Sequence, residues 1–284
     1  MTRIGPYTLH TLETGRFRLD GGAMFGIVPK PLWARRLPPD ERNRITLAMR
    51  CLLLESSDRL VLIDTGIGDT YDDRFADLFA IDHAHSDLHR SLAGAGFSAA
   101  DVTDVILTHL HFDHAGGGTR RVGDRMVPAF PSARYHVQAA HWSWAMHPNP
   151  REKGSFLAEK LEPLAASGQL HLVEGPGPLL PGVEVMTVDG HTEAQQIVKI
   201  GAGEDVLVFV ADLLPTTHHL APAWGMAYDV RPLVALEEKA LLLEQALQGG
   251  WQLFFEHDPD VAVADLERTE RGIRAVAGRP LAER

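Results

Sequence analysis

The segment THLHFDHAGGG, residues 108–118, concentrates side chains that bind metal ions. Its donors are His109, His111, Asp113 and His114. Imidazole and carboxylate groups together suit zinc, manganese, iron or cobalt. Because residues two apart in an extended chain project to the same side, His109 and His111 can hold one ion while Asp113 and His114 point elsewhere. The spacing therefore indicates a site for two metal ions.

Other apolar stretches of the chain also end in a polar residue that could complete such a site. The residues at or just after these stretches are Asp64, His109, His191, Asp212 and His257. In open α/β sheets, functional residues gather at the carboxyl ends of strands. One aspartate after a strand is often only a turn former, but the repetition favours a shared site.

The elements that must position these residues alternate between strands and helices. Apolar runs predict strands at 45–55, 59–64, 104–108, 133–138, 183–188, 196–200, 205–211 and 252–256. Several of these runs are apolar at every position, which indicates burial on both faces. Helical spacing is found at 86–95, 138–146, 151–166, 231–248 and 263–277. This order predicts a layered α/β fold.

Length and composition limit the classes of protein to consider. The 284 residues, 45% hydrophobic, suit a single domain over 1–284 with an N-terminal arm of about residues 1–44, rich in glycine and proline from residue 16 onward. A formal net charge of -11 argues against nucleic-acid binding. The lone cysteine, Cys51, excludes an intrachain disulfide. No leader or membrane-spanning pattern is visible, so we expect a cytoplasmic protein with no membrane partner.

The HxHxDH motif at 109–114, with the polar residues above in the same order, resembles the metallo-β-lactamase superfamily. The resemblance spans residues 45–258 and implies a four-layer αββα sandwich. It also implies ligand roles: His109, His111 and His191 on a first metal, Asp113, His114 and His257 on a second, and Asp212 as the bridge. It further implies that Asp64 orients ligands from outside the metal contacts.

Two other stretches resemble the quorum-quenching lactonase branch of that superfamily, of the YtnP type and related to methyl parathion hydrolases. They are DGGAMFGIVPKPLW at 20–33 and DLLPTTHHLAPAW with MAYD within 212–229. That branch opens N-acyl-homoserine lactones. Its best-known members carry a tyrosine three residues after the bridging aspartate, where this chain has Pro215. Tyr228 is the candidate to fill that place.

We therefore predict a dinuclear metal-dependent hydrolase, most simply a lactonase. Two divalent ions, zinc or else cobalt, manganese or iron, would supply a hydroxide that attacks the lactone carbonyl. Asp113 or Asp212 would relay a proton to the leaving alkoxide.

The substrate would be a small acylated lactone or ester, and its acyl chain needs an apolar wall. The candidates for this wall are Met24, Phe25, Trp33 and Tyr228. We expect His218 to hydrogen-bond Asp212 from outside the metal contacts. The apolar arm at 24–38 could pack across a two-fold axis in a homodimer, or else fold over its own active site.

Three alternative functions remain open on the same site. A phosphotriesterase, or organophosphate hydrolase, would use the same hydroxide against phosphorus. A thioesterase of the glyoxalase type is less favoured because no basic cluster for glutathione is visible. A non-catalytic sensor of an acyl ligand would fit a degenerate site, whereas the ligand set in this sequence is complete.

Overall fold

Two seven-stranded sheets form the centre of the computed structural model, which describes residues 3–203, 205–270 and 272–277. The first sheet has the order β1 (Arg3–Ile4), β2 (Tyr7–Asp20), β3 (Arg44–Glu55), β4 (Leu60–Ile63), β5 (Asp104–Ile106), β8 (Arg134–Gln138) and β9 (Leu170–Val173). The second has the order β10 (Gly177–Leu180), β11 (Val183–Val188), β12 (Gln195–Ala202), β13 (Asp205–Phe209), β14 (Gln252–Phe254), β15 (Val263–Thr269) and β16 (Gly272–Ala277). A separate hairpin joins β6 (Thr119–Val122) to β7 (Arg125–Pro128).

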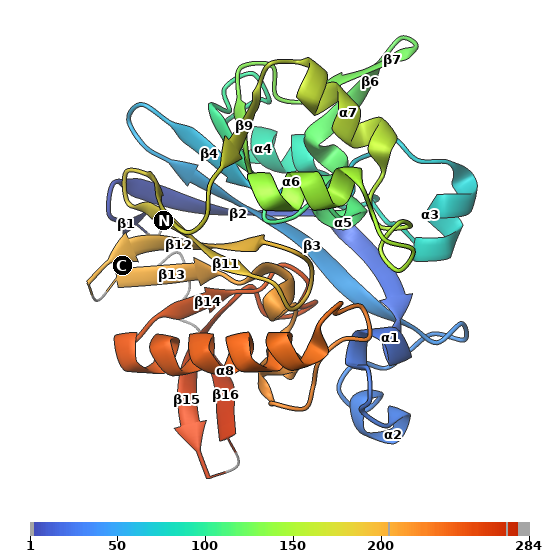
Figure 1. Cartoon of the computed structure of the whole chain (residues 1–284), viewed down its shortest axis with the longest axis vertical. Helices are drawn as coiled ribbons and strands as arrows, with labels where there is room; N and C mark the ends of the chain where they lie inside the picture. The colour runs from blue at the N-terminus through green and yellow to red at the C-terminus, as the bar shows by residue number, and fades with distance from the viewer. Residues whose placement is uncertain (1–2, 204, 271, 278–284) are drawn as a thin grey trace.

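Helices cover the outer face of each sheet (Figure 1). Over the first sheet lie α4 (Leu88–Gly94), α5 (Phe112–Ala115), α6 (Ala139–Met146) and α7 (Ala158–Ala166). Over the second lies α8 (Pro232–Gly249). Shorter helices are α1 (Gly21–Phe25), α2 (Lys30–Trp33), α3 (Asp73–Phe79), η1 (Gly116–Gly118), η2 (Ala211–Leu213) and η3 (Thr217–Leu220). The predicted αββα sandwich is confirmed.

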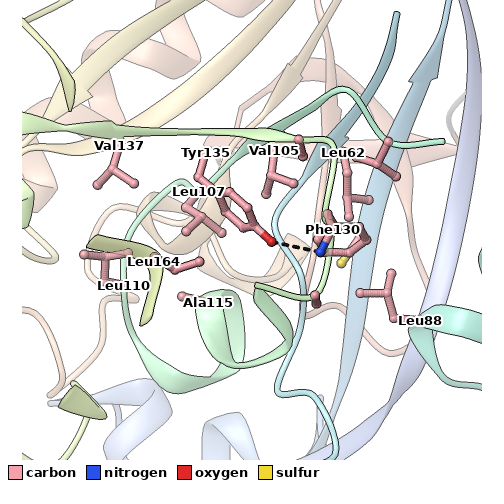
Figure 2. Close-up of a cluster of buried hydrophobic side chains, with 14 of the residues drawn as sticks. Leu62, Leu88, Val105, Leu107, Leu110, Ala115, Phe130, Tyr135, Val137 and Leu164 are labelled. Atoms are coloured by element: carbon pink, nitrogen blue, oxygen red, sulfur yellow. Dashed lines mark hydrogen bonds between the residues drawn. The ribbon is translucent and has the colours of Figure 1, made fainter. Parts of the chain in front are cut away.

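Strict alternation along the central strands explains why they are apolar at nearly every position. In β4, Val61 and Ile63 face the second sheet, whereas Leu60 and Leu62 face the helices. Successive side chains of a strand point to opposite faces, so a strand covered on both sides must be apolar throughout. Figure 2 shows the helix-side core, in which the Tyr135 hydroxyl accepts a hydrogen bond from the Phe130 backbone N–H at 3.1 Å.

The N-terminal segment contributes a long strand that the sequence pattern does not predict. β2 pairs antiparallel with β3 from Thr8 opposite Glu55 to Asp20 opposite Arg44, with an irregularity between Glu13 and Arg16. Residues 21–43, which carry α1 and α2, lie beyond the end of this strand (Figure 1).

The helix predicted at 263–277 is wrong, because this segment forms the antiparallel strands β15 and β16. Phe254 pairs with Val263, so β15 extends the sheet from β14. Backbone pairing at an open sheet edge overrides a weak helical pattern. The helix predicted at 151–166 begins only at Ala158. Among the described residues, none of the helices combines the length and apolarity that crossing a membrane requires.

Candidate metal centre

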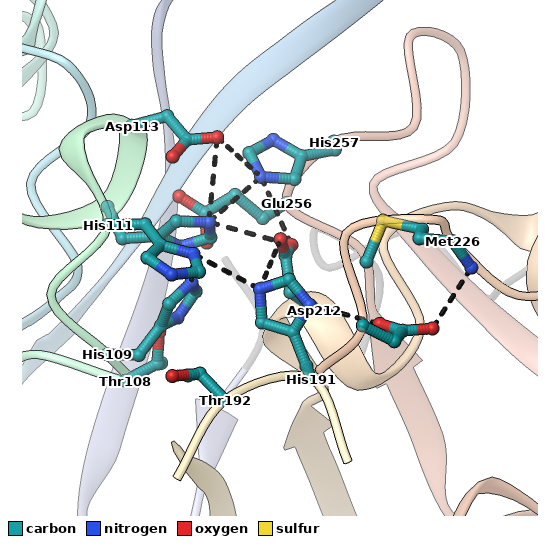
Figure 3. A network of polar contacts seen from close by, with 12 residues as sticks. Thr108, His109, His111, Asp113, His191, Thr192, Asp212, Met226, Glu256 and His257 are labelled. Atoms are coloured by element: carbon teal, nitrogen blue, oxygen red, sulfur yellow. Dashed lines mark hydrogen bonds and ion pairs between the residues drawn. The ribbon is translucent and has the colours of Figure 1, made fainter. Parts of the chain in front are cut away.

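The carboxyl ends of four strands deliver the predicted donors to one place. β4 and β5 run parallel, as do β13 and β14, so their carboxyl ends point to the same edge of each sheet. The THLHFDHA segment follows β5, and the remaining donors follow β11, β13 and β14. Figure 3 shows them converging: His109, His111, Asp113, His191, Asp212 and His257.

Three imidazoles form the first donor group. His109 Nε2 lies 3.1 Å from His111 Nδ1, and His191 Nε2 lies 3.2 Å from the same His111 atom. All three residues are buried. Their facing nitrogens could share one metal ion.

Two imidazoles and a carboxylate form the second donor group. His114 Nε2 and His257 Nε2 are 3.0 Å apart. Asp113 Oδ2 lies 3.8 Å from His114 Nε2 and 3.6 Å from His257 Nε2. These atoms also could share one ion.

Asp212 lies between the two donor groups. Its Oδ2 is 3.3 Å from His191 Nε2 in the first group. Its Oδ1 is 3.5 Å from His114 Nε2 and 3.3 Å from His257 Nε2 in the second. Each carboxylate oxygen therefore faces a different group, which is the arrangement that a bridging ligand requires.

Hydrogen bonds on the outer nitrogens leave the inner nitrogens of four imidazoles free to bind metal. The outer contacts are His109 Nδ1 with Thr108 Oγ1 at 3.1 Å, His191 Nδ1 with Asp229 Oδ1 at 3.1 Å, His114 Nδ1 with Asp64 Oδ2 at 3.0 Å, and His257 Nδ1 with the Ala48 carbonyl at 2.9 Å. When an oxygen accepts the outer N–H, the inner nitrogen of a neutral imidazole carries a lone pair.

The donor set fits divalent metal ions. Two neutral imidazole nitrogens that face each other at 3.0–3.2 Å need a shared proton or a common cation. Asp212 Oδ1 is buried and has no hydrogen-bond partner among the described residues. A buried carboxylate oxygen without a donor is costly, and a metal ion would satisfy it.

The charges of the site favour an ionised bridge and neutral imidazoles at His109 and His111. Against the opposing effect of burial, nearby carboxylates raise the pKa of His114, His191 and His257. Burial opposes ionisation of Asp212, but the imidazoles of His114, His257 and His191 together hold its pKa well below the usual range. Burial and the neighbouring imidazoles hold the pKa of His109 well below its usual value. Neutral imidazole and ionised carboxylate are the forms that bind metal.

Asp64 contacts one residue of the second donor group, His114, from outside the facing nitrogens. It adopts a left-handed backbone with φ 57°. Its carboxylate accepts hydrogen bonds from the Thr108 backbone N–H at 2.7 Å and the Thr108 hydroxyl at 2.6 Å, besides its contact with His114. One carboxylate therefore fixes both the start of the metal-binding segment and one ligand.

Three buried acidic residues at the site are absent from our sequence prediction. Glu256 Oε2 lies 3.0 Å from His114 Nδ1, and burial raises its pKa to about 8 against the opposing effect of His114. Glu152 Oε1 lies 3.5 Å from His111 Nε2. Asp229 contacts His191. Only the position of Glu256, next to His257 at a strand end, gave a signal in the sequence.

His219, and not His218, occupies the buried position behind the site. His219 Nε2 is 2.8 Å from the Met24 carbonyl, and its ring stacks on Phe25 with centroids 5.0 Å apart. His218 is only partly buried, and the charged groups that act on it are Asp258, Arg36 and Asp260. No side-chain hydrogen bond joins it to Asp212 in the described part of the chain.

The four residues predicted to line an apolar wall divide into two pairs. Met24 and Tyr228 line a cavity of about 490 Å³ that contains the donors, together with Leu19, Phe79, Phe112 and Met226. We call this the metal-site cavity. Phe25 and Trp33 are fully buried behind it, stacked with ring centroids 5.7 Å apart, and they are not among its lining residues.

Asp229 connects a metal ligand to the cavity wall. One carboxylate oxygen contacts His191, and the other accepts the Met226 backbone N–H at 3.0 Å. We expect Asp229→Ala to weaken zinc binding by about 10- to 100-fold, because outer hydrogen bonds fix the orientation of a ligand. Competition with a chelator of known affinity measures this loss.

Two controls separate this effect from general destabilisation. Asp229→Asn retains an acceptor oxygen and should bind zinc more tightly than the alanine variant. Asp124→Ala removes an exposed carboxylate in the β6–β7 turn and should leave zinc affinity unchanged. Wild-type zinc affinity in Asp229→Ala would contradict the role that we assign to this residue.

Comparisons with known proteins agree with this geometry. The family model described as "Metallo-beta-lactamase superfamily" matches residues 50–257. A probable metallo-hydrolase of Mycobacterium tuberculosis is 28% identical, with 85% of this chain and 83% of that protein covered. An N-acyl homoserine lactonase of Bacillus cereus is 27% identical over 59% of this chain and 64% of its own length.

Solved structures give the same result for the fold. A probable metal-dependent hydrolase from Staphylococcus aureus has a TM-score of 0.89 and 31% identity, covering 98% of this chain and 99% of its own. AidC, described as a dizinc quorum-quenching lactonase in complex with a product, has a TM-score of 0.80 and 22% identity, covering 98% of this chain and 96% of its own. With the motif, the fold and the family match in agreement, the chain belongs to the metallo-beta-lactamase superfamily and is a metal-dependent hydrolase.

Proposed function

We propose that this hydrolase is a dinuclear lactonase that opens N-acyl-homoserine lactones. The observation that carries the proposal is the metal-site cavity, whose lining joins five of the seven metal donors to an apolar wall, with His109 and His114 completing the two donor groups. A cavity of about 490 Å³ lies within the usual range for small-molecule sites. The lactonase names among the relatives support the substrate class.

Zinc is the metal that we propose. Two divalent ions held by these donors would activate water and polarise the ester carbonyl. A carboxylate oxygen of Asp113 or Asp212 would take a proton from the attacking water. The same oxygen would return that proton to the ring oxygen as the ester C–O bond breaks.

Tyr228 is suited to donate a hydrogen bond to the substrate carbonyl as negative charge develops on it. Its side chain lines the metal-site cavity, whereas Pro215 is not part of this lining. Tyr228 is 37% exposed, and its partial burial, with the carboxylates of Asp20 and Asp113, raises its pKa to about 12, so the phenol keeps its proton at neutral pH. A donor aimed at a developing oxyanion accelerates acyl transfer.

A substrate panel tests the proposal. The zinc-loaded protein is assayed for kcat/KM with N-acyl-homoserine lactones, with aryl phosphotriesters and with thioesters. We expect the lactones to be the best substrates. A higher kcat/KM for the phosphotriesters would establish the alternative organophosphate hydrolase, and tight binding of acyl lactones without turnover would identify a sensor.

We also propose that two copies of the chain associate through residues 24–38. Ile27 in this segment is 89% exposed, and Leu32 is 50% exposed. Exposed apolar side chains of this kind often mark an interface. Sedimentation of the wild-type chain should give the mass of a dimer, and Leu32→Asp should shift it to a monomer. A monomeric wild-type chain would refute the association.

A further inference from the structure

A second cavity adjoins the metal-site cavity on the other side of the segment 225–229. It has a volume of about 590 Å³ and contacts the bridging residue Asp212. We call it the side cavity. The two cavities share the lining residues Arg151, Asp212, Met226 and Ala227. Figure 3 shows Met226 on the far side of Asp212 from His111, where this shared wall lies.

The lining of the side cavity is mainly apolar, and the charged side chains in it form hydrogen bonds with the protein. Lys239 Nζ donates to the carbonyls of Ala221, Pro222 and Trp224 at 3.0, 3.0 and 3.1 Å. An ammonium group has three donors, so this one is fully satisfied by the loop that it supports.

Two further charged groups of the wall, Arg151 and Asp229, also contact the protein. Arg151 Nη2 donates to the carbonyls of Ala227 and Asp229. The carboxylate of Asp229 is bound to His191 and to the Met226 backbone N–H. Most of the remaining lining is apolar, so the surface offered to a ligand consists mainly of hydrocarbon.

Apolar side chains at the rim of the side cavity are exposed. Leu233 and Leu236 on α8 are 76% and 40% exposed. An apolar surface that begins at a catalytic carboxylate and opens to solvent fits a flexible hydrocarbon chain attached to a polar reacting group.

We propose that the side cavity holds the distal part of the substrate's acyl chain, so that its lining selects chain length. This inference rests on the proposed lactonase function. The lactone ring and amide occupy the metal-site cavity, and the chain passes the wall formed by Met226 and Arg151. Short acyl chains end before this wall, whereas long chains extend beyond it and gain burial in the side cavity.

Two leucine-to-tryptophan variants on the same helix provide the test. Leu236→Trp places a larger side chain at the cavity lining. Leu241→Trp is the matched control, because Leu241 is 62% exposed on α8 and is not part of the lining. Both positions are on the surface, so neither change should disrupt the core. The readout is kcat/KM for N-butanoyl- and N-dodecanoyl-homoserine lactone.

We expect Leu236→Trp to lower kcat/KM for the dodecanoyl substrate by about 10-fold or more, because losing even one buried methylene contact costs about this factor. The value for the butanoyl substrate should change less than twofold. Leu241→Trp should match wild type on both. An equal loss on both substrates, or no loss with Leu236→Trp, would overturn the proposal.

A binding measurement keeps this test independent of turnover. Calorimetry of the zinc-loaded proteins with N-dodecanoyl- and N-butanoyl-homoserine, the ring-opened products, reports acyl-chain binding directly. If the wild-type protein opens no lactone but Leu236→Trp selectively weakens dodecanoyl binding, the lactonase proposal fails and the chain subsite stands. If dodecanoyl binding is unchanged in Leu236→Trp, the subsite is refuted whatever the turnover.

Discussion

Replacing Asp212 with alanine is expected to abolish metal binding and hydrolysis together. Its two carboxylate oxygens face different donor groups, so the substitution removes a ligand from each. Loss of an outer partner of a ligand already costs about 10- to 100-fold in affinity or activity, and loss of the bridging ligand itself should cost more than about 100-fold. Metal content by elemental analysis and kcat/KM on the best substrate measure the two effects.

The loss of metal binding in Asp212→Ala also predicts how the thermal stability of this variant responds to added zinc. Without Asp212, the imidazoles of His114, His191 and His257 lose a buried negative partner. A ligand stabilises a protein only as far as it binds the folded state, so the Asp212→Ala protein should gain little thermal stability from added zinc. Asp77→Ala, which removes an exposed carboxylate paired with Arg42, is the control and should behave as wild type. Two bound metals and full activity in Asp212→Ala would disprove the bridging role.

The spacing of apolar residues predicts the central strands of the two sheets well, but it misses or misassigns strands at the sheet edges. β4 and residues 206–209 of β13 are apolar at every position because both faces are covered, and this leaves a clear signal in the sequence. β15 and β16 lie at the edge of the second sheet, where polar residues such as Glu267 and Arg268 are tolerated and resemble a helix pattern. β2 alternates more weakly, and its irregularity between Glu13 and Arg16 interrupts the period.

The sequence predicts the metal donors because histidines and an aspartate seldom occur as close together as they do at 109–114. It does not predict their outer partners, because Glu152 and Asp229 stand in irregular segments where acidic residues are common on a surface. Only the folded chain shows that both are buried, at 3% and 4% exposure, beside His111 and His191. The Gly-rich segment and the resemblance likewise suggest Phe25 as a wall residue, whereas the structure stacks its ring on His219.

The second large effect concerns the glycines that follow the metal-binding histidines. We expect Gly117→Ala to destabilise the protein by about 1–3 kcal/mol or more and to displace the second donor group. A Cβ at Gly117 would lie 2.3 Å from the Thr65 carbonyl oxygen, which is backbone and cannot turn aside. The Thr65 backbone N–H and hydroxyl both donate to the His114 carbonyl at 2.8 Å, so moving Thr65 also moves a ligand.

The adjacent Gly118 is the matched control, because the same substitution should have almost no cost there. A Cβ at Gly118 would meet the Tyr135 ring at 3.6 Å, an ordinary van der Waals contact. Replacing glycine with alanine where the backbone permits it restricts the unfolded chain, so Gly118→Ala should be neutral or stabilising by up to about 1 kcal/mol.

Chemical denaturation of both variants without metal measures the effect on folding stability. A later zinc titration measures the effect on metal binding. Gly117→Ala should lose unfolding free energy before any metal is added and should then bind zinc more weakly than Gly118→Ala. Equal stabilities of the two variants would mean that the close approach at Thr65 does not constrain the segment. The glycine run would then serve only as a flexible connection, and the rigidity of His114 would have to come from Asp64 and Glu256 alone.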